Sequence, residues 1–248
     1  AAAGLLEFGL SDHFVLTPYA DSDAHEWSMP GNGGSFEACL NELRDAAVDA
    51  GITVRYGVET DYFPETWERV RDVLDGFDLD YVIGSVHAVG HFPIDSSPDH
   101  WKPLSQQEIN TVYRTYWQRL RELAECGLAD VIGHLDLPKK FGYRPDCDLT
   151  DLQEAFFDAL VRAGTAIELN TAGWDKVCGE AYPEPALLRQ ACERGIPVIL
   201  SADAHAPDEV ARYFGRGAAL LREAGYRQTL RFEKRRPAAM PLPAHTEL

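Results

Sequence analysis

The sequence predicts an α/β fold in which short buried strands alternate with helices. Three features lead to this prediction: apolar, β-branched runs recur along the chain, most of them run into a residue able to bind a metal, and segments of helical length separate them. Strands that alternate with helices of this length form parallel βαβ units. A chain of 248 residues is long enough for a large α/β domain, and we expect residues 1–248 to form one domain.

The clearest predicted strand begins at Pro197, continues through the apolar residues 198–200 and ends in Asp203 and His205. In extended backbone, residues i and i+2 point to the same side, so Asp203 and His205 could bind one cation. The other five predicted strands cover residues 6–10, 53–58, 81–86, 130–133 and 165–169. They lead into Asp12 and His13, Glu59, His87, His134 and Asn170, respectively.

The recurrence of this pattern predicts a metal site. A single Asp-x-His pair is equally compatible with a helix-capping acid beside a surface histidine. Parallel sheets and α/β barrels, however, collect the carboxyl ends of their strands on one face. The residues predicted to meet there as metal ligands are His13, Glu59, His87, His134, Asp203 and His205.

The predicted helices fill the intervals between the strands, at residues 36–50, 64–74, 105–126, 149–163, 184–194 and 207–224. Several are bounded by capping signals, such as Gly127 after the third of them. Loops occupy residues 17–34, 88–104, 135–148 and 170–182. Residues 1–5 resemble the last turn of a helix, which predicts a seventh strand before residue 1. The sequence leaves open whether the tail 231–248 packs across the barrel or is mobile.

The formal net charge of −17 argues against a general nucleic-acid surface, because binding a polyanion normally needs a basic stripe. It leaves room for a small phosphorylated metabolite as the partner. The five cysteines are widely spaced and form no C-x-x-C, which predicts free thiols and a cytoplasmic protein. No apolar segment approaches the roughly 18 residues of a membrane span, so no membrane partner is expected.

The ordered motifs resemble the polymerase-and-histidinol-phosphatase (PHP) superfamily. The segments that carry this resemblance are Ser11–His13, Gly57–Glu59, Gly84–His87, Ile132–His134 and Asp203–His205. Four further stretches are similar to the histidinol-phosphate phosphatases of that superfamily: Gly133–Phe141, Glu168–Trp174, Glu180–Pro183 and Ser201–Pro207. The resemblance extends over nearly the whole chain, to about Tyr226.

The resemblance implies a distorted (β/α)7 barrel that holds two or three divalent metal ions, zinc, iron or manganese. By analogy Glu59 bridges two ions, His87 and His134 complete one site, His13 and His205 serve another, and Asp203 serves the remaining site. The family opens with an H-x-H motif on its first strand, whereas this sequence has no histidine before His13. The helix-like opening favours a first strand outside the chain over a lost metal site.

The implied reaction is hydrolysis of L-histidinol phosphate to L-histidinol and phosphate in histidine biosynthesis, by a metal-bound hydroxide. Asp12 and Asp136 lie beside ligand histidines and are candidates for orienting imidazoles or moving protons; either could equally be a cap. The candidates for phosphate binding lie on loops and are Lys139, Lys140, Arg144 and Lys176. The candidates for binding the amino-imidazole end are Asp61, Tyr62, Phe63 and Trp101.

Two alternatives stay open at this point. One is another PHP phosphoesterase, acting on a nucleotide or a phosphoprotein. The other is a degenerate, non-catalytic barrel that holds a structural metal, if the H-x-H motif is truly absent. The six spaced ligands count against this second alternative, because a structural zinc needs only about four.

Overall fold

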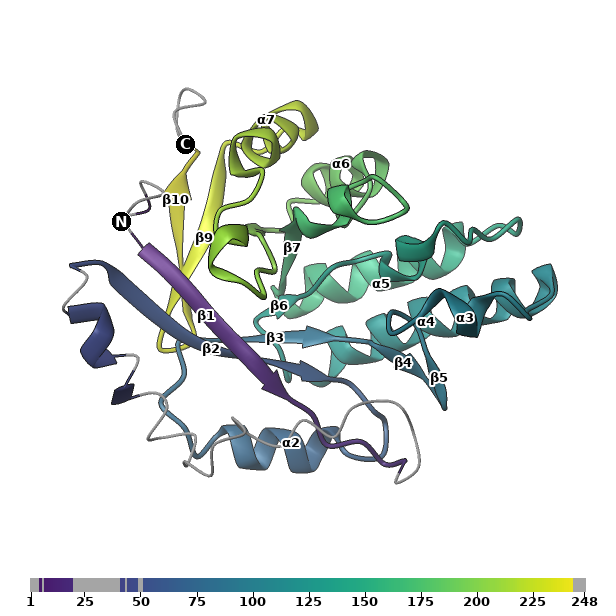
Figure 1. Ribbon diagram of the computed structural model, residues 1–248, viewed down its shortest axis with the longest axis horizontal. Coiled ribbons are helices and arrows are strands. Elements are labelled where there is room, and N and C mark those ends of the chain that lie inside the picture. Colours follow the sequence, from purple (N-terminus) through teal and green to yellow (C-terminus); the bar gives the residue numbers. More distant parts are fainter. Residues whose placement is uncertain (1–4, 6, 20–40, 43, 49–50, 243–248) are drawn as a thin grey trace.

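The computed structural model describes residues 5, 7–19, 41–42, 44–48 and 51–242. Its central sheet has six parallel strands in the order β1, β2, β3, β6, β7, β8. These strands are β1 (Glu7–Phe14), β2 (Thr53–Asp61), β3 (Tyr81–Ser85), β6 (Val131–Ile132), β7 (Ala166–Asn170) and β8 (Val198–Ser201). The sheet curls into a partial barrel with helices around its outside (Figure 1), which confirms the predicted α/β fold.

The described helices overlap the predicted ones, except Pro98–Trp101, which lies within the segment 88–104 that the sequence predicted to be a loop. They are α2 (Trp67–Leu74), α3 (Pro98–Trp101), α4 (Gln106–Cys126), α5 (Thr150–Ala163), α6 (Pro185–Glu193) and α7 (Phe214–Ala224). Short 3-10 turns follow three of the strands, as η1 (Leu137–Phe141), η2 (Ala172–Asp175) and η3 (Pro207–Glu209). A small antiparallel pair, β4 (Ala88–Val89) and β5 (Phe92–Pro93), follows β3.

The predicted helix 207–224 is wrong in its first half. The chain makes the short turn η3 and enters α7 only at Phe214. Ala211 and Tyr213 intervene with φ values of 61° and 60°, a left-handed conformation that residues with a Cβ seldom adopt and that interrupts a right-handed helix. The left-handed conformation cannot be predicted from the sequence, because alanine and tyrosine are not residue types that favour it.

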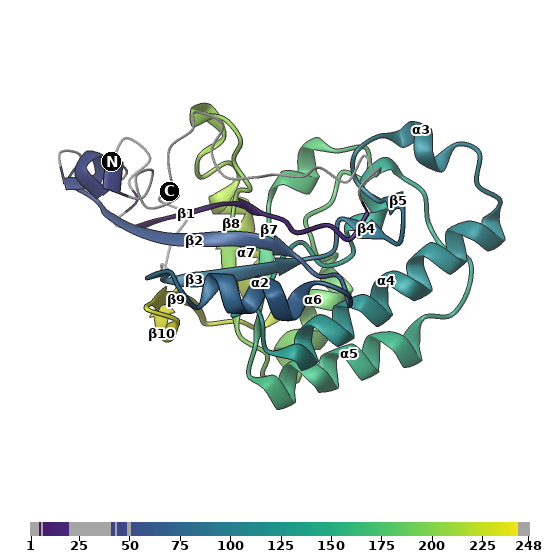
Figure 2. The same ribbon diagram turned by 90° about the horizontal axis from the view of Figure 1, so that it is seen from below.

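Helix α4 supplies much of the core between the sheet and the outer helices. Its start is a capping box, in which the Ser105 side chain accepts from the Glu108 amide and the Glu108 side chain accepts from the Ser105 amide. Gly127 ends it at φ 71°, where a residue without a Cβ is favoured. The aromatic residues Tyr113, Tyr116 and Trp117 are buried. Figure 2 shows α4 and α5 running side by side under the sheet.

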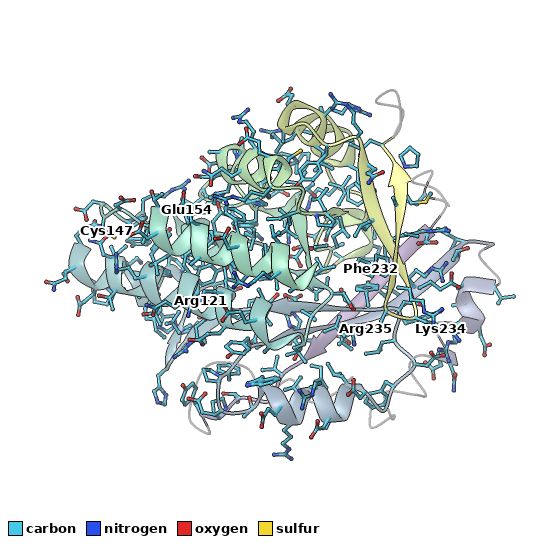
Figure 3. The ribbon with its side chains drawn as sticks, turned by 180° about the vertical axis from the view of Figure 1, so that it is seen from behind. Arg121, Cys147, Glu154, Phe232, Lys234 and Arg235 are labelled. Atoms are coloured by element: carbon cyan, nitrogen blue, oxygen red, sulfur yellow. The ribbon has the colours of Figure 1, made fainter. Side chains whose placement is uncertain are left out.

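The tail that the sequence left open forms a hairpin, β9 (Gln228–Glu233) with β10 (Arg236–Pro241). Phe232 packs into an apolar cluster with Tyr81 and Val131 beneath the sheet. Arg235 pairs with Asp130, which directly precedes β6, and Figure 3 shows Phe232, Lys234 and Arg235 along this hairpin. The hairpin therefore covers the amino-terminal ends of the strands, opposite the predicted site.

Some predictions fall outside the described residues. Most of the loop 17–34, residues 1–4 of the predicted helix tail and residues 243–248 belong to this part, and the seventh strand stays a prediction. Within the predicted helix 36–50, residues 41–42 and 44–48 are helical. No helix in the described ranges is long and apolar enough to cross a bilayer. The described cysteines, Cys126, Cys147, Cys178 and Cys192, are free thiols.

Candidate metal centre

The parallel register brings the predicted ligands to one edge of the sheet. His13 lies directly opposite Glu59 in the β1–β2 pair, and Glu59 lies opposite Ile83 in the β2–β3 pair. His87 follows β3 by two residues, and His134 follows β6 by two residues. Because parallel strands end at the same edge, the four side chains meet although 121 positions separate His13 from His134.

Glu59 is the centre of this cluster. Its Oε1 lies 3.0 Å from His134 Nε2 and 3.4 Å from His87 Nε2, and its Oε2 lies 3.9 Å from His13 Nε2. Ser85 donates a hydrogen bond of 2.7 Å to the same Oε1. One ligand atom each from His13, Glu59 and His87 lies within 4.8 Å of the others, as expected for ligands of one ion.

The charges within the cluster favour binding of a cation between Glu59 and the three histidines. Burial opposes ionisation of Glu59, but the three histidines hold the pKa of its carboxyl well below the usual range. Burial likewise opposes protonation of His87 and His134, yet Asp61 raises the pKa of the first and Glu59 that of the second. A divalent cation supplies this charge without protonating the ligands.

The donor set fits a borderline metal ion. Asp61 Oδ1 lies 2.5 Å from His87 Nδ1, an arrangement that places the proton on Nδ1 and leaves the Nε2 lone pair facing Glu59. The Nε2 atoms of His87 and His134 are only 3.0 Å apart, so their lone pairs and the carboxylate converge on one small volume. Mixed imidazole and carboxylate ligands suit zinc, iron or manganese better than magnesium or calcium.

β8 ends at Ser201 and Asp203 has a φ of 48°, so the predicted extended strand through Asp203 and His205 is wrong. Asp203 instead joins the cluster from the turn after β8, through Asn170 on β7. The Asn170 amide nitrogen is 3.1 Å from Asp203 Oδ2 and 3.2 Å from Glu168 Oε2. Glu168 Oε2 also accepts a 2.7 Å hydrogen bond from the His134 backbone, and burial raises the pKa of this carboxyl. His205 stands at the rim, with 71% of its side chain exposed and its Nδ1 3.6 Å from Asp203 Oδ1.

A cavity of about 450 Å³ opens over the cluster. The predicted residues that line it are Asp12, His13, Glu59, Asp61, His87, His134, Lys140, Lys176, Asp203 and His205. Lys140 Nζ lies 3.0 Å from Asp95 Oδ2, and Lys176 is exposed at the edge. Asp12 is also exposed, and its carboxylate accepts from the His13 amide. The cavity therefore joins a metal-binding end to two lysines.

Lys139, Asp136 and Arg144 are not among the described residues that line this cavity. Lys139 is fully buried, with Nζ 2.9 Å from Asp136 Oδ2 and 2.7 Å from the Ala181 carbonyl. Burial raises the pKa of Asp136 to about 7, although Lys139 acts against this shift. Arg144 reaches Glu180 at 2.8 Å instead. Lys139, Arg144 and Asp136 therefore lie outside the lining of this cavity. Substrate contact by the two basic residues, and imidazole orientation or proton transfer by Asp136, stay predictions.

Trp101 is likewise a core residue, because it is fully buried and its indole donates to the Ile94 carbonyl at 2.8 Å. Arg212 lines the cavity, although no role was predicted for it from the sequence. Glu168 and Asn170 were likewise not predicted to belong to the site. These two residues are i and i+2 at the end of β7, so the strand-end pattern that located the other ligands also applied to them.

Comparisons with known proteins show which family the chain is similar to. Residues 1–172 match the model of the PHP domain family. The chain is 42% identical over 241 residues to a probable histidinol-phosphatase of Deinococcus radiodurans, covering 95% of this chain and 88% of that protein. It is 27% identical over 176 residues to a histidinol-phosphatase of Bacillus subtilis, covering 64% and 66% of the two chains.

A crystal structure of histidinol phosphate phosphatase from Lactococcus lactis, in complex with zinc, L-histidinol and phosphate, has the same fold. It superposes with a TM-score of 0.70 at 18% identity, over 96% of this chain and 89% of that one. The family model covers more than half of this chain, and the Deinococcus relative matches nearly all of it. The chain therefore belongs to the PHP domain family.

Proposed function

We propose that this protein hydrolyses L-histidinol phosphate to L-histidinol and phosphate. The observation that carries the proposal is the convergence of His13, Glu59, His87 and His134 beside a cavity lined by Lys140 and Lys176. Relatives named histidinol-phosphatase, and the Lactococcus structure with zinc, L-histidinol and phosphate, support the choice of substrate.

We expect two or three zinc, iron or manganese ions, held by His13, Glu59, His87, His134, Asp203 and His205. Such ions offset the charge of phosphoryl oxygens and make water more acidic. The surrounding side chains hold the ligands in place: Asp61 orients the His87 imidazole, and Ser85 orients the Glu59 carboxylate.

The remaining tasks fall to residues that line the cavity. We expect Lys140 and Lys176 to contact the phosphoryl oxygens, because both line the cavity that contains the ligands. The leaving alkoxide of histidinol needs a proton, and Asp12 lines the same cavity and is open to solvent. A location in the cytoplasm is expected from the free thiols.

The test is phosphate release from L-histidinol phosphate with zinc or manganese added. Glu59→Gln removes the central carboxylate and should abolish turnover, as should a chelator. Glu125→Gln is the matched control, because Glu125 is a half-exposed residue of α4 that pairs with Arg162 at 3.1 Å. A metal-loaded wild type that releases no phosphate, or that prefers nucleotides or phosphopeptides, would overturn the proposal.

A further inference from the structure

The turn that carries Asp203 and His205 has an unusual backbone. It links β8 to η3 through residues 202–206, and Asp203 adopts a φ of 48°. A residue with a Cβ is strained in this left-handed region, and it stays there only when its surroundings hold it. The side chains around the turn are therefore part of the site.

Two of these side chains, of Arg212 and Glu209, hydrogen-bond to the backbone of the turn on either side of Asp203. Arg212 Nη2 donates a 3.0 Å hydrogen bond to the carbonyl of Ala202, the residue before Asp203. Glu209 Oε2 accepts a 2.7 Å hydrogen bond from the His205 backbone. Arg212 Nη1 and Glu209 Oε1 are 3.0 Å apart. The pair thus closes a ring of contacts around Asp203.

Arg212 is itself held by neighbouring elements. Its Nη1 lies 3.1 Å from Asp175 Oδ2 on η2, and its backbone carbonyl accepts a 2.6 Å hydrogen bond from the Thr171 hydroxyl. Only 14% of its side chain is exposed. Two carboxylates, of Asp175 and Glu209, already pair with its single charge.

We propose that Arg212 and Glu209 are positioning residues that hold the Asp203–His205 turn in the conformation that binds metal. Asn170 fixes the side chain of Asp203 from β7, whereas the Arg212–Glu209 pair fixes the backbone on either side of it. The inference rests on the proposed function only in taking Asp203 and His205 as ligands, and metal binding tests it without turnover.

The experiment measures zinc and manganese bound to the full chain by equilibrium dialysis, for Arg212→Met, Glu209→Ala and the double variant. We expect loss of an ion, or affinity about 10–100-fold weaker, at the site that the turn serves. The double variant should lose little more than the worse single variant, because both act on one turn. Arg194→Met is the control, since Arg194 pairs with Asp158 at 3.3 Å on the outer helices.

Arg212→Lys keeps the charge, but a single ammonium group cannot contact both the Ala202 carbonyl and the Glu209 carboxylate. Its metal affinity should therefore lie between those of Arg212→Met and the wild type. If Arg212→Met fails to fold, the metal affinity of Arg212→Lys tests the proposal in its place. Unchanged metal affinity in a folded Arg212→Met or Arg212→Lys, with only a raised KM, would overturn the proposal and make Arg212 a phosphate ligand. A wild type that binds metal but releases no phosphate would contradict the proposed function alone.

Discussion

Replacing Asp61 by asparagine tests how the His87 imidazole is held in the metal centre. The Asp61 carboxylate is 6% exposed and lies 2.5 Å from His87 Nδ1. Burial acts to lower the pKa of His87, but the charge and hydrogen bond of Asp61, together with the charges of Asp95 and Glu59, outweigh burial and raise the pKa well above its ordinary value. The Asp61 charge makes the opposite nitrogen, Nε2, a stronger metal donor.

Asp61→Asn keeps the shape and an oxygen acceptor but removes the charge. Loss of such a partner weakens metal binding by about 10–100-fold, which corresponds to about 1.4–2.7 kcal/mol. The assay is competition for zinc between the metal-free protein and a chromophoric chelator, with circular dichroism to confirm that the variant is folded.

Asp99→Asn provides the matched control. Asp99 is an exposed acid on α3, and it pairs with Lys102 at 2.6 Å. We expect its zinc affinity to equal that of the wild type. If folded Asp61→Asn also bound zinc as tightly as the wild type, the reasoning that the Asp61 charge strengthens the His87 ligand would be refuted.

Three further predictions concern the core and the pH dependence. Lys139→Met leaves Asp136 and Glu180 without their buried cation, and the free energy of unfolding in urea should fall by about 3–5 kcal/mol; a loss no larger than that of exposed Lys102→Met would contradict this. Trp101→Ala should cost about 3–5 kcal/mol through the cavity it creates, whereas Trp101→Phe should leave KM unchanged, and a raised KM would place Trp101 in the substrate site. In the metal-free protein nearby carboxylates outweigh burial and raise the pKa values of His87 and His134. Protonation of these histidines therefore stabilises the folded state, and this contribution is complete below the pKa of about 6.5 that histidine has in the unfolded chain. This stabilisation is lost as the pH rises through the raised pKa values, so the melting temperature of the chelator-treated protein should fall over that pH range. The fall should be smaller in His87→Gln, and identical pH profiles for the wild type and this variant would contradict the prediction.

The strand-end pattern was readable from the sequence because it depends on local periodicity and on one rule of topology. Short apolar runs that lead into His13, Glu59, His87 and His134 need only be parallel for their ends to meet. The register then brings His13 opposite Glu59. No long-range information beyond the strand order was required.

The two adjacent lysines show where this reasoning stops. Lys139 and Lys140 are neighbours on η1, and nothing in their sequence context separates them. In the structure Lys139 is buried against Asp136 and the 180–184 segment, whereas Lys140 lines the cavity beside Asp95. Which of the two turns inward depends on partners more than 40 positions away.

The sequence by itself therefore determined the α/β class, the positions of the strands along the chain and the residues that cluster around Glu59, since each of these follows from short-range patterns and from one rule of topology. Only the tertiary structure decided that the tail forms a hairpin, that the last helix begins at Phe214, and that Arg212 reaches back to Ala202. These outcomes depend on left-handed backbone conformation at non-glycine residues, such as Ala211 and Tyr213, and on contacts between segments that are distant in the sequence. Their energies arise only when the whole chain has packed.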